Sequence, residues 1–381
     1  MMIYLDYAAT TPMSEKALET YIKAATNYFG NEQSLHDVGS SASSLLEACR
    51  KAFAKIISGK EQGVFFTSGG SESNFLALQS LLEAHDGKHI VTTPLEHASI
   101  RSYFHLLQTK GYTITEIPVN SQGLINLKVL ERSITPDTVL ACIQHGNSEI
   151  GTVQPLAEIS KLLKKHNILL HTDCVQTFGK LPIDVEKMSI DSLSVSAHKL
   201  YGPKGVGACY INPRVRWKAV FPHTSHEKGF RPGTVNVPGI ASFITASEEM
   251  IKHREAEMNR LRQLRTYFIE RLQANSNIIQ IEGHSTSCLP HIIGVTIKGI
   301  EGQYTMLECN RYGIGVSTGS ACQIGKQEPP KTMLAIGKTV EEAKQYVRFS
   351  FGRHTTKEEI DATIDVLKTV ENQFFYRGVT L

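Results

Sequence analysis

Short apolar segments of strand length alternate with longer, helix-length segments between residues 63 and 211. The strand-like segments lie at 63–67, 89–93, 112–119, 138–144, 168–172, 192–196 and 207–211. Two of the helix-length segments lie at 72–84 and 156–166, and the second places Leu156, Ile159, Leu162 and Leu163 on one face with a helical period. This alternation predicts an α/β fold with a mostly parallel sheet.

The order of elements changes after residue 237. Residues 238–275 have the pattern of one long helix, 291–298 and 346–351 of strands, and 357–372 of a helix. We therefore expect a large α/β domain at 15–255 and a smaller α+β domain made of 1–14 and 256–381. A Gly- and Ser-rich stretch at 313–325, followed by 326–330, carries Cys322 and has the composition of an exposed, mobile loop. We expect this cysteine loop of the smaller domain at about 316–330.

Composition excludes several classes of protein. With 40 Lys and Arg against 37 Asp and Glu, the net charge of +3 is too small to indicate nucleic-acid binding. No apolar segment approaches the roughly 18 residues of a membrane span, and the N-terminus lacks the basic start of a signal peptide. Seven cysteines without a CxxC pair favour neither a zinc site nor a disulfide scaffold, so reduced thiols and a cytoplasmic location are expected.

Three motifs in the predicted α/β domain could carry chemistry. In FFTSGGSESN (65–74) an apolar strand enters a glycine turn before a helix, where backbone N–H groups and the helix dipole favour an anion. In LLHTDCVQ (169–176) Asp173 follows an apolar strand, and in SVSAHKLYGPKG (194–205) Lys199 enters a Gly/Pro turn. Taken singly, an ordinary strand–helix turn, a helix N-cap and a solvated loop lysine explain these motifs as well.

Taken together, the three motifs match the needs of one cofactor, pyridoxal 5'-phosphate. Its phosphate needs backbone N–H donors, its pyridinium nitrogen needs a carboxylate, and its aldehyde needs a lysine amine. The motifs supply these groups in one α/β domain, the carboxylate from Asp173 and the amine from Lys199. No other common cofactor needs this set.

These residues resemble the NifS/IscS-type cysteine desulfurases, in the class V aminotransferase family of fold-type I pyridoxal-phosphate enzymes. The resemblance covers essentially the whole chain. It is carried by YLDYAATTP, TSGGSESN, LEHAS, NSEIGTVQP, HTDCVQTFGKLPID, SAHKLYGPKGVGA, RPGT, GSAC and VRFSFGR, in that order. It implies a large domain with a mostly parallel seven-stranded sheet and a smaller α+β domain; the cysteine spacing already indicates that no metal site is present.

The resemblance also implies a role for individual residues. Lys199 resembles the lysine that binds the cofactor aldehyde, Cys322 the nucleophile that accepts sulfur, and His97 the imidazole that stacks on the cofactor ring and moves protons. The other cofactor ligands implied are Gly70, Ser71, Ser148, Asp173, Gln176, Ser196, His198 and Thr234, the last donated to the partner of a homodimer. Arg348 resembles the clamp on the substrate carboxylate, since a guanidinium fork binds two carboxylate oxygens, and Asn147 and Asn31 are expected to contact substrate.

The chain departs from the family pattern at three places. NSEIG stands where the family usually has NNEIG, so Ser148 takes a position that normally contacts the cofactor ring. Serine is shorter than asparagine but still forms hydrogen bonds, so we expect cofactor binding to survive. FPHTS (221–225) replaces a longer Gly-rich run, which predicts altered dimer contacts, and GNEQS stands for GNPSS.

The implied activity is removal of sulfur from L-cysteine, giving L-alanine and a persulfide on Cys322. The persulfide is then passed to an acceptor protein, such as an iron–sulfur scaffold, a tRNA thiolation protein or a dedicated recipient. A selenocysteine lyase is the alternative, because its chemistry is nearly the same; another class V enzyme would not need a mobile cysteine. A non-catalytic scaffold is disfavoured because Lys199, Asp173 and Cys322 are all present.

Overall fold

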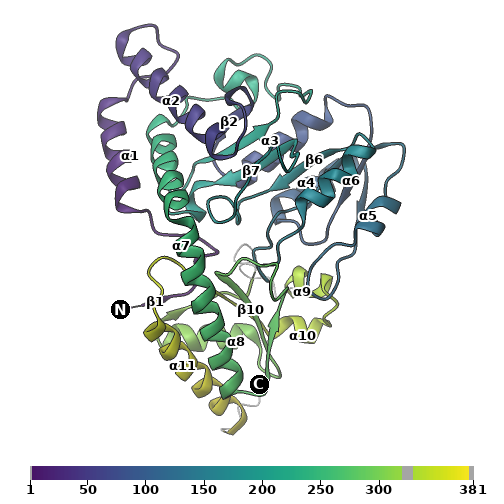
Figure 1. Cartoon of the computed structure of the whole chain (residues 1–381), viewed down its shortest axis with the longest axis vertical. Helices are drawn as coiled ribbons and strands as arrows, with labels where there is room; N and C mark the ends of the chain where they lie inside the picture. Colours follow the sequence, from purple (N-terminus) through teal and green to yellow (C-terminus); the bar gives the residue numbers. More distant parts are fainter. Residues whose placement is uncertain (1, 320–328, 377–381) are drawn as a thin grey trace.

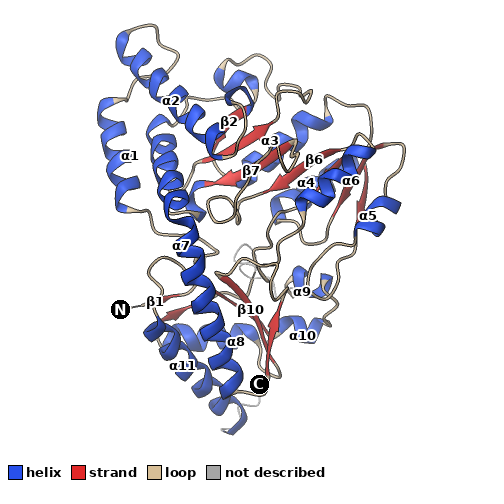
Figure 2. Cartoon of the chain, viewed as in Figure 1, coloured by secondary structure: helices blue, strands red, loops and turns tan. Residues whose placement is uncertain are grey.

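The computed structural model describes residues 2–319 and 329–376. A seven-stranded sheet with its helices forms the upper part of the molecule in Figure 1, and a smaller sheet with helices α8 and α11 forms the lower part. Figure 2 shows the two sheets in red, joined by the long helix α7 (Val237–Asn275). The predicted nucleophile Cys322 lies outside the described residues.

The large sheet is mixed and mostly parallel, as predicted. Its strand order is β2-β8-β7-β6-β5-β3-β4, and only β8 runs antiparallel to its neighbours. All seven predicted strands are present, several of them shorter than predicted. Their bounds are β2 Val64–Thr67, β3 His89–Thr92, β4 Thr113–Glu116, β5 Thr138–Cys142, β6 Leu169–Asp173, β7 Ser192–Ser196 and β8 Gly207–Ile211.

Helices cover both faces of this sheet, because its strands are apolar on both sides. Phe66, Val91 and Ala141 pack in one core with α2, α6 and the first half of α7, whereas Phe65, Ile90 and Leu140 pack in another with α3 and α4. Side chains of a strand alternate between faces, so neighbouring residues fall in different cores. The helices are α1 Glu15–Asn27, α2 Asp37–Ile56, α3 Gly70–Leu82, α4 Ala98–Thr109, α5 Leu127–Arg132, α6 Leu156–Lys165, α7 Val237–Asn275, α8 Gly302–Arg311, α9 Lys331–Ala335, α10 Val340–Lys344 and α11 Lys357–Tyr376.

The long helix α7 contributes to two separate cores. Ile240 and Phe243 in its first half belong to the core of the large sheet, whereas Leu261 and Phe268 belong to a core with α8 and α11. The predicted boundary at residue 255 therefore falls inside one continuous helix. The second core also covers an antiparallel sheet of β9 Ile279–Glu282, β10 Ile292–Ile297 and β12 Tyr346–Ser350, in the order β12-β10-β9.

The first residues of the predicted cysteine loop are held by pairing with other strands. Ile314–Gly315 forms strand β11, which pairs in parallel with β1 (Ile3–Tyr4), and Ser317 bridges Arg348 on β12. The glycine-rich composition predicted an irregular segment here, but pairing with distant strands overrides that local preference. Residues 320–328 lie outside the described residues. In the part of the chain that is described, no helix combines the length and apolar character needed to cross a membrane.

Candidate active site

The predicted site residues converge on one edge of the large sheet. Strands β2, β3, β5, β6 and β7 share one direction, so their carboxyl ends meet there. The glycine turn at 68–70 follows β2, Asp173 ends β6, and Lys199 lies in the short helix η2 (Ala197–Lys199) directly after β7. This edge is where open α/β sheets bind ligands.

The turn after β2 forms one wall of a cavity. Gly69 has φ +153° and ψ −177°, a conformation that essentially only glycine adopts. A side chain on Gly70 would collide with Val175, since its Cβ would lie 2.5 Å from Val175 Cγ2. The cavity of about 470 Å³ is lined by Ala9, Thr10, Ser68, Gly69, Gly70, Ser71, Glu72, Ser196, His198, Lys204 and Gly205. Helix α3 begins here, so its first backbone N–H groups favour an anion.

Lys199 is held against the segment that follows β1. Its Nζ donates to the carbonyl oxygens of Ala8 at 2.6 Å and Ala9 at 2.7 Å. Its own carbonyl accepts a hydrogen bond of 2.9 Å from Lys180 Nζ, which also donates to the carbonyl of Gln176 at 3.3 Å. Burial and the charge of Lys199 lower the pKa of Lys180 to about 7. The side chains of Lys180 and Lys199 thus hold together the backbone at 8–9, Gln176 and Lys199, a cluster called the Lys199 corner below.

Asp173 and Gln176 flank this corner. Asp173 Oδ1 accepts from the N–H of Val175 at 2.9 Å, and Oδ2 accepts from Asn74 Nδ2 at 2.8 Å. Gln176 Nε2 donates to the Ala8 carbonyl at 3.0 Å, the same oxygen that Lys199 contacts. The Gln176 Oε1 atom is buried and has no hydrogen-bond partner among the described residues, so it is available to a bound group.

Two histidines complete this edge, and both favour the neutral form. His97 caps α4, where its Nδ1 accepts from the Ser99 N–H at 3.2 Å. Desolvation lowers the pKa of His97 from 6.5; Asp173 opposes this shift, whereas Lys199 and Arg101 add to it. His198 Nδ1 contacts Thr10 Oγ1 at 3.1 Å, and burial, helped by nearby lysines, lowers the pKa of His198 to about 4. Ser196, at the end of β7, is buried beside the cavity.

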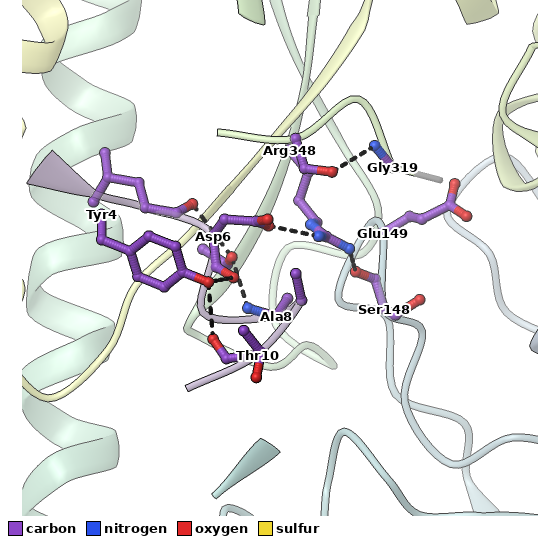
Figure 3. A network of polar contacts seen from close by, with 12 residues as sticks. Tyr4, Asp6, Ala8, Thr10, Ser148, Glu149, Gly319 and Arg348 are labelled. Atoms are coloured by element: carbon purple, nitrogen blue, oxygen red, sulfur yellow. Dashed lines mark hydrogen bonds and ion pairs between the residues drawn. The ribbon is translucent and has the colours of Figure 1, made fainter. Parts of the chain in front are cut away.

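Arg348 belongs to strand β12 and lies beside the start of the segment that leads to Cys322 (Figure 3). Its guanidinium donates to Asp6 Oδ1 at 2.7 Å and to the Ser148 carbonyl at 2.9 Å, while its Nε is buried without a partner among the described residues. The Glu149 carboxyl lies nearby; burial raises the pKa of Glu149, and Arg348 opposes that shift. A Cβ placed on Gly319 would lie 3.2 Å from Glu149 Oε2, so the segment leading to Cys322 passes against this carboxyl group.

Asn147 and Ser148 have structural contacts in the turn after β5. Asn147 Oδ1 accepts from the N–H groups of Glu149 and Ile150 at 2.9 and 2.8 Å, which closes the turn. Ser148 offers its backbone carbonyl to Arg348. Contact of Asn147 with substrate and of the Ser148 side chain with cofactor stay predictions.

Asn31 and Thr234 do not line the cavity within one chain. Both are exposed, Asn31 in the connection from α1 to α2 and Thr234 before α7. Donation of Thr234 to a partner subunit and contact of Asn31 with substrate stay predictions. Cys322 lies outside the described residues.

Two of the departures from the family pattern meet in space. In the GNEQS segment, Gln33 Oε1 accepts from Ser225 Oγ at 2.8 Å, and Glu32 Oε1 lies 3.7 Å from His226 Nε2. The Glu32 side chain is only 7% exposed. The shortened 221–225 segment and the altered turn after α1 therefore form one packed unit, which leads into the segment that carries Thr234.

A family comparison decides what this arrangement belongs to. Residues 3–363 match the model of the family described as aminotransferase class V. The chain belongs to this family. The model covers nearly the whole chain, including each of the predicted site residues.

Named relatives within this class V family are similar over their full length. A putative cysteine desulfurase NifS of Bacillus subtilis (strain 168) is 49% identical over 98% of this chain and 95% of the relative. A solved NifS-like protein has a TM-score of 0.91 at 31% identity and covers 98% of this chain and 100% of that one. A structure of SspA in complex with cysteine has a TM-score of 0.82 at 29% identity, over 93% of this chain and 100% of that one.

The class V family is dependent on pyridoxal phosphate, and the residues of this chain fit that group. The glycine turn and the start of α3 offer N–H donors without side chains in the way. Gln176, whose buried Oε1 has no partner among the described residues, shares the Ala8 carbonyl with Lys199 through its Nε2, and the Asp173 carboxylate ends β6, the strand next to the one that leads to Lys199. These donors, acceptors and the amine match the phosphate, ring and aldehyde of the cofactor.

Sequence reasoning missed several polar residues that support this site. Asp6 pairs with Arg348, Lys180 supports the Lys199 corner, and Asn74 contacts Asp173. All three lie inside motifs quoted above. Their contacts depend on the packing of distant strands, which a local pattern does not reveal.

Glu96, next to His97, supplies a prediction about pH. Its Oε1 accepts from Thr93 Oγ1 and the Gln144 N–H at 2.9 Å, while burial raises the pKa of Glu96 to about 8. Between about pH 4.5 and 8 the folded chain therefore binds a proton that the unfolded chain has lost, so stability falls as pH rises through this range. Glu96→Gln removes the titratable group, so the variant should not lose stability in this way as pH rises. We expect its free energy of unfolding to rise relative to wild type by a few kcal/mol from pH 5 to 8.5, at about 1.4 kcal/mol per pKa unit.

Urea unfolding at the two pH values measures this difference. Glu116→Gln on β4 is the matched control, since Glu116 is exposed and should show no such trend. An equal effect of Glu96→Gln at both pH values would contradict the prediction.

Proposed function

We propose that the chain is a pyridoxal-phosphate-dependent cysteine desulfurase. It removes sulfur from L-cysteine, releases L-alanine and carries the sulfur as a persulfide on Cys322. The main support is the convergence of an anion-binding turn, Asp173 and Lys199 at one sheet edge, in a chain 49% identical to a relative named as a putative cysteine desulfurase. A structural relative, SspA, which was solved in complex with cysteine, supports the choice of substrate.

The residues that would hold the cofactor follow from the site. The 68–71 turn, Ser196 and His198 would bind the phosphate, with Thr234 of a second subunit. Asp173 would face the ring nitrogen, Gln176 the ring oxygen, His97 the ring face and Lys199 the aldehyde. Bound there, the cofactor supplies an electron sink for the bond-breaking step at the substrate Cα.

Side chains of this protein would transfer protons and bind the substrate carboxylate. The Lys199 amine would remove the proton from the substrate Cα. His97 is a proton donor or acceptor through Nε2, because its Nδ1 already accepts from Ser99. Arg348 binds the substrate carboxylate, and Asn147 and Asn31 of the predicted substrate set would add contacts.

Sulfur transfer is assigned to Cys322. Its thiolate attacks the substrate sulfur, the Cβ–S bond breaks with its electron pair left on the carbon skeleton, and that skeleton takes up protons at Cβ and Cα and leaves as alanine. The segment that leads to Cys322 leaves the described structure at Gly319, beside Glu149. The persulfide passes to an acceptor protein for iron–sulfur or other sulfur-compound synthesis, in a reducing compartment such as the cytoplasm.

A homodimer is proposed as the working form. Exposed apolar side chains gather on α1 and the segment leading into α2, namely Leu18, Tyr21, Ile22, Phe29, Leu35 and Val38. Apolar groups of this size mark interaction surfaces. This surface and the exposed Thr234 are the features that support a partner subunit of the same chain.

The dimer gives a measurable prediction. Phe29→Glu with Leu35→Glu should weaken dimerisation by roughly 100-fold or more, because each apolar side chain contributes about 1.5–3 kcal/mol when buried. Sedimentation equilibrium measures the dissociation constant. Leu307→Glu on α8, with a half-exposed side chain outside this surface, is the matched control. An unchanged constant in the double variant would place the dimer contact elsewhere.

The decisive test of function is product analysis with the purified holoenzyme. It should release equimolar alanine and sulfide from L-cysteine in the presence of a thiol reductant. Parallel assays with selenocysteine separate the desulfurase from a selenocysteine lyase. A persulfide-transfer assay against candidate acceptors then identifies the recipient. No alanine from cysteine, with another amino acid transaminated instead, would overturn the proposal.

A further inference from the structure

A branched chain of hydrogen bonds centred on Asn74 lies behind the proposed cofactor-facing residues. Asn74 is 1% exposed, near the start of α3. Its Nδ2 donates to Asp173 Oδ2 at 2.8 Å and to Ser99 Oγ at 3.3 Å, and its Oδ1 lies 3.2 Å from His171 Nε2. One buried amide therefore contacts three strand- or helix-borne groups at once.

The chemistry of these partners fixes the direction of each bond. The Asp173 carboxylate only accepts, so the NH₂ group of Asn74 must face it and Oδ1 must face His171. His171 therefore carries its proton on Nε2, and its Nδ1 accepts from Ser192 Oγ at 3.0 Å. Complete burial lowers the pKa of His171 to about 3, which agrees with a neutral ring.

The same direction continues to His97. Ser99 Oγ accepts from Asn74, so its hydroxyl hydrogen is free to donate to His97 Nδ1 at 2.9 Å. The Ser99 backbone N–H donates to the same nitrogen. With two donors facing Nδ1, the neutral His97 ring carries its proton on Nε2.

We propose that Asn74 and Ser99 are positioning residues: Asn74 holds the Asp173 carboxylate in the orientation that faces the cofactor ring, and Ser99 restricts the exchangeable proton of His97 to Nε2. The first half of this proposal rests on the proposed function. The second concerns the chain alone. Through these contacts, Asp173 and His97, the two residues proposed to lie against the cofactor ring, are both connected to the buried amide of Asn74.

The His97 half is tested by ¹⁵N NMR of the imidazole in the full-length protein. Wild type should show the Nε2–H form of His97. Ser99→Ala removes one donor to Nδ1, so we expect the ratio of the two tautomers to shift by about fivefold toward Nδ1–H. Ser73→Ala, at a fully buried serine that contacts Thr67 and not this network, should leave the ratio unchanged. A shift equal in both variants, or absent in Ser99→Ala, would overturn this half.

The Asp173 half is tested by ligand affinity. Asn74→Leu keeps the size of the side chain but removes its donors, and Asn74→Ala is the second variant if leucine prevents folding. We expect affinity for pyridoxal 5'-phosphate to fall at least tenfold, and affinity for its 1-deaza analogue, which has no ring nitrogen, to fall much less. Equal losses for both ligands would show a merely structural role and overturn the assignment.

These outcomes separate the inference from the proposed function. If wild type binds neither ligand, the cofactor assignment fails, while the tautomer measurement still decides the role of Ser99. If wild type prefers pyridoxal phosphate over the deaza analogue and the Asn74 variants keep that preference, the cofactor assignment stands and the role of Asn74 is wrong.

Discussion

Lys199→Ala is expected to lower alanine release from L-cysteine by about 10⁴-fold or more, because the amine both anchors the cofactor and removes the substrate proton. Nearby lysines do not offer a replacement. Lys180 is buried and donates to the backbone carbonyls of Lys199 and Gln176, so its amine is already committed to the same corner.

The structure suggests a matched variant for this experiment. Lys199 Nζ donates to the carbonyl oxygens of Ala8 and Ala9, so alanine could also loosen the segment after β1. Lys199→Arg keeps a cationic donor for those oxygens but cannot bind an aldehyde covalently. Both variants should lose activity if the amine takes part in the reaction. If Lys199 only holds the backbone of Ala8 and Ala9 in place, Lys199→Arg should retain activity.

Borohydride reduction followed by mass spectrometry supplies an independent measurement. Reduction should fix the cofactor to the wild-type chain at Lys199 and leave both variants unlabelled. Retention of a reducible cofactor linkage in Lys199→Ala would show that the lysine assignment is wrong.

The fold was predictable because its signals are local. Strands buried on both faces appear as short apolar runs, and the runs that became β7 and β8 were predicted with the bounds that the structure has. Asp173 and Lys199 each follow a predicted strand, so their position at the carboxyl end of a strand could be deduced from the sequence. The edge itself follows from strand order, which sequence periodicity alone does not give.

Other features depend on contacts between distant segments. Strand β11 forms in a glycine-rich stretch because β1, some 300 residues earlier, is available to pair with it. The Asn74 network joins α3, β6 and α4, and no spacing in the sequence predicts it. The Glu32–His226 approach likewise links two departures from the family pattern that appear unrelated along the chain.

Cys322→Ser is expected to abolish sulfide release while leaving cofactor binding intact. A serine hydroxyl does not form a persulfide, so the substrate sulfur has no acceptor on the chain. The remaining cysteines are poor substitutes. Burial raises the pKa of the Cys49, Cys174 and Cys309 thiols to about 12, so these groups stay protonated and unreactive at neutral pH.

Cys288 is the matched control, because it is the one cysteine in the described ranges that is not buried. Cys288→Ser should keep wild-type sulfide release, and peptide mapping after reaction with cysteine should find the persulfide on Cys322 in that variant. Cys322→Ser should still show the cofactor absorbance and its change on adding cysteine, which separates loss of sulfur transfer from loss of substrate binding. Sulfide release at the wild-type rate by Cys322→Ser would show that Cys322 is not the nucleophile. Loss of sulfide release in Cys288→Ser would also contradict the assignment, because sulfur transfer would then need a cysteine outside the predicted loop.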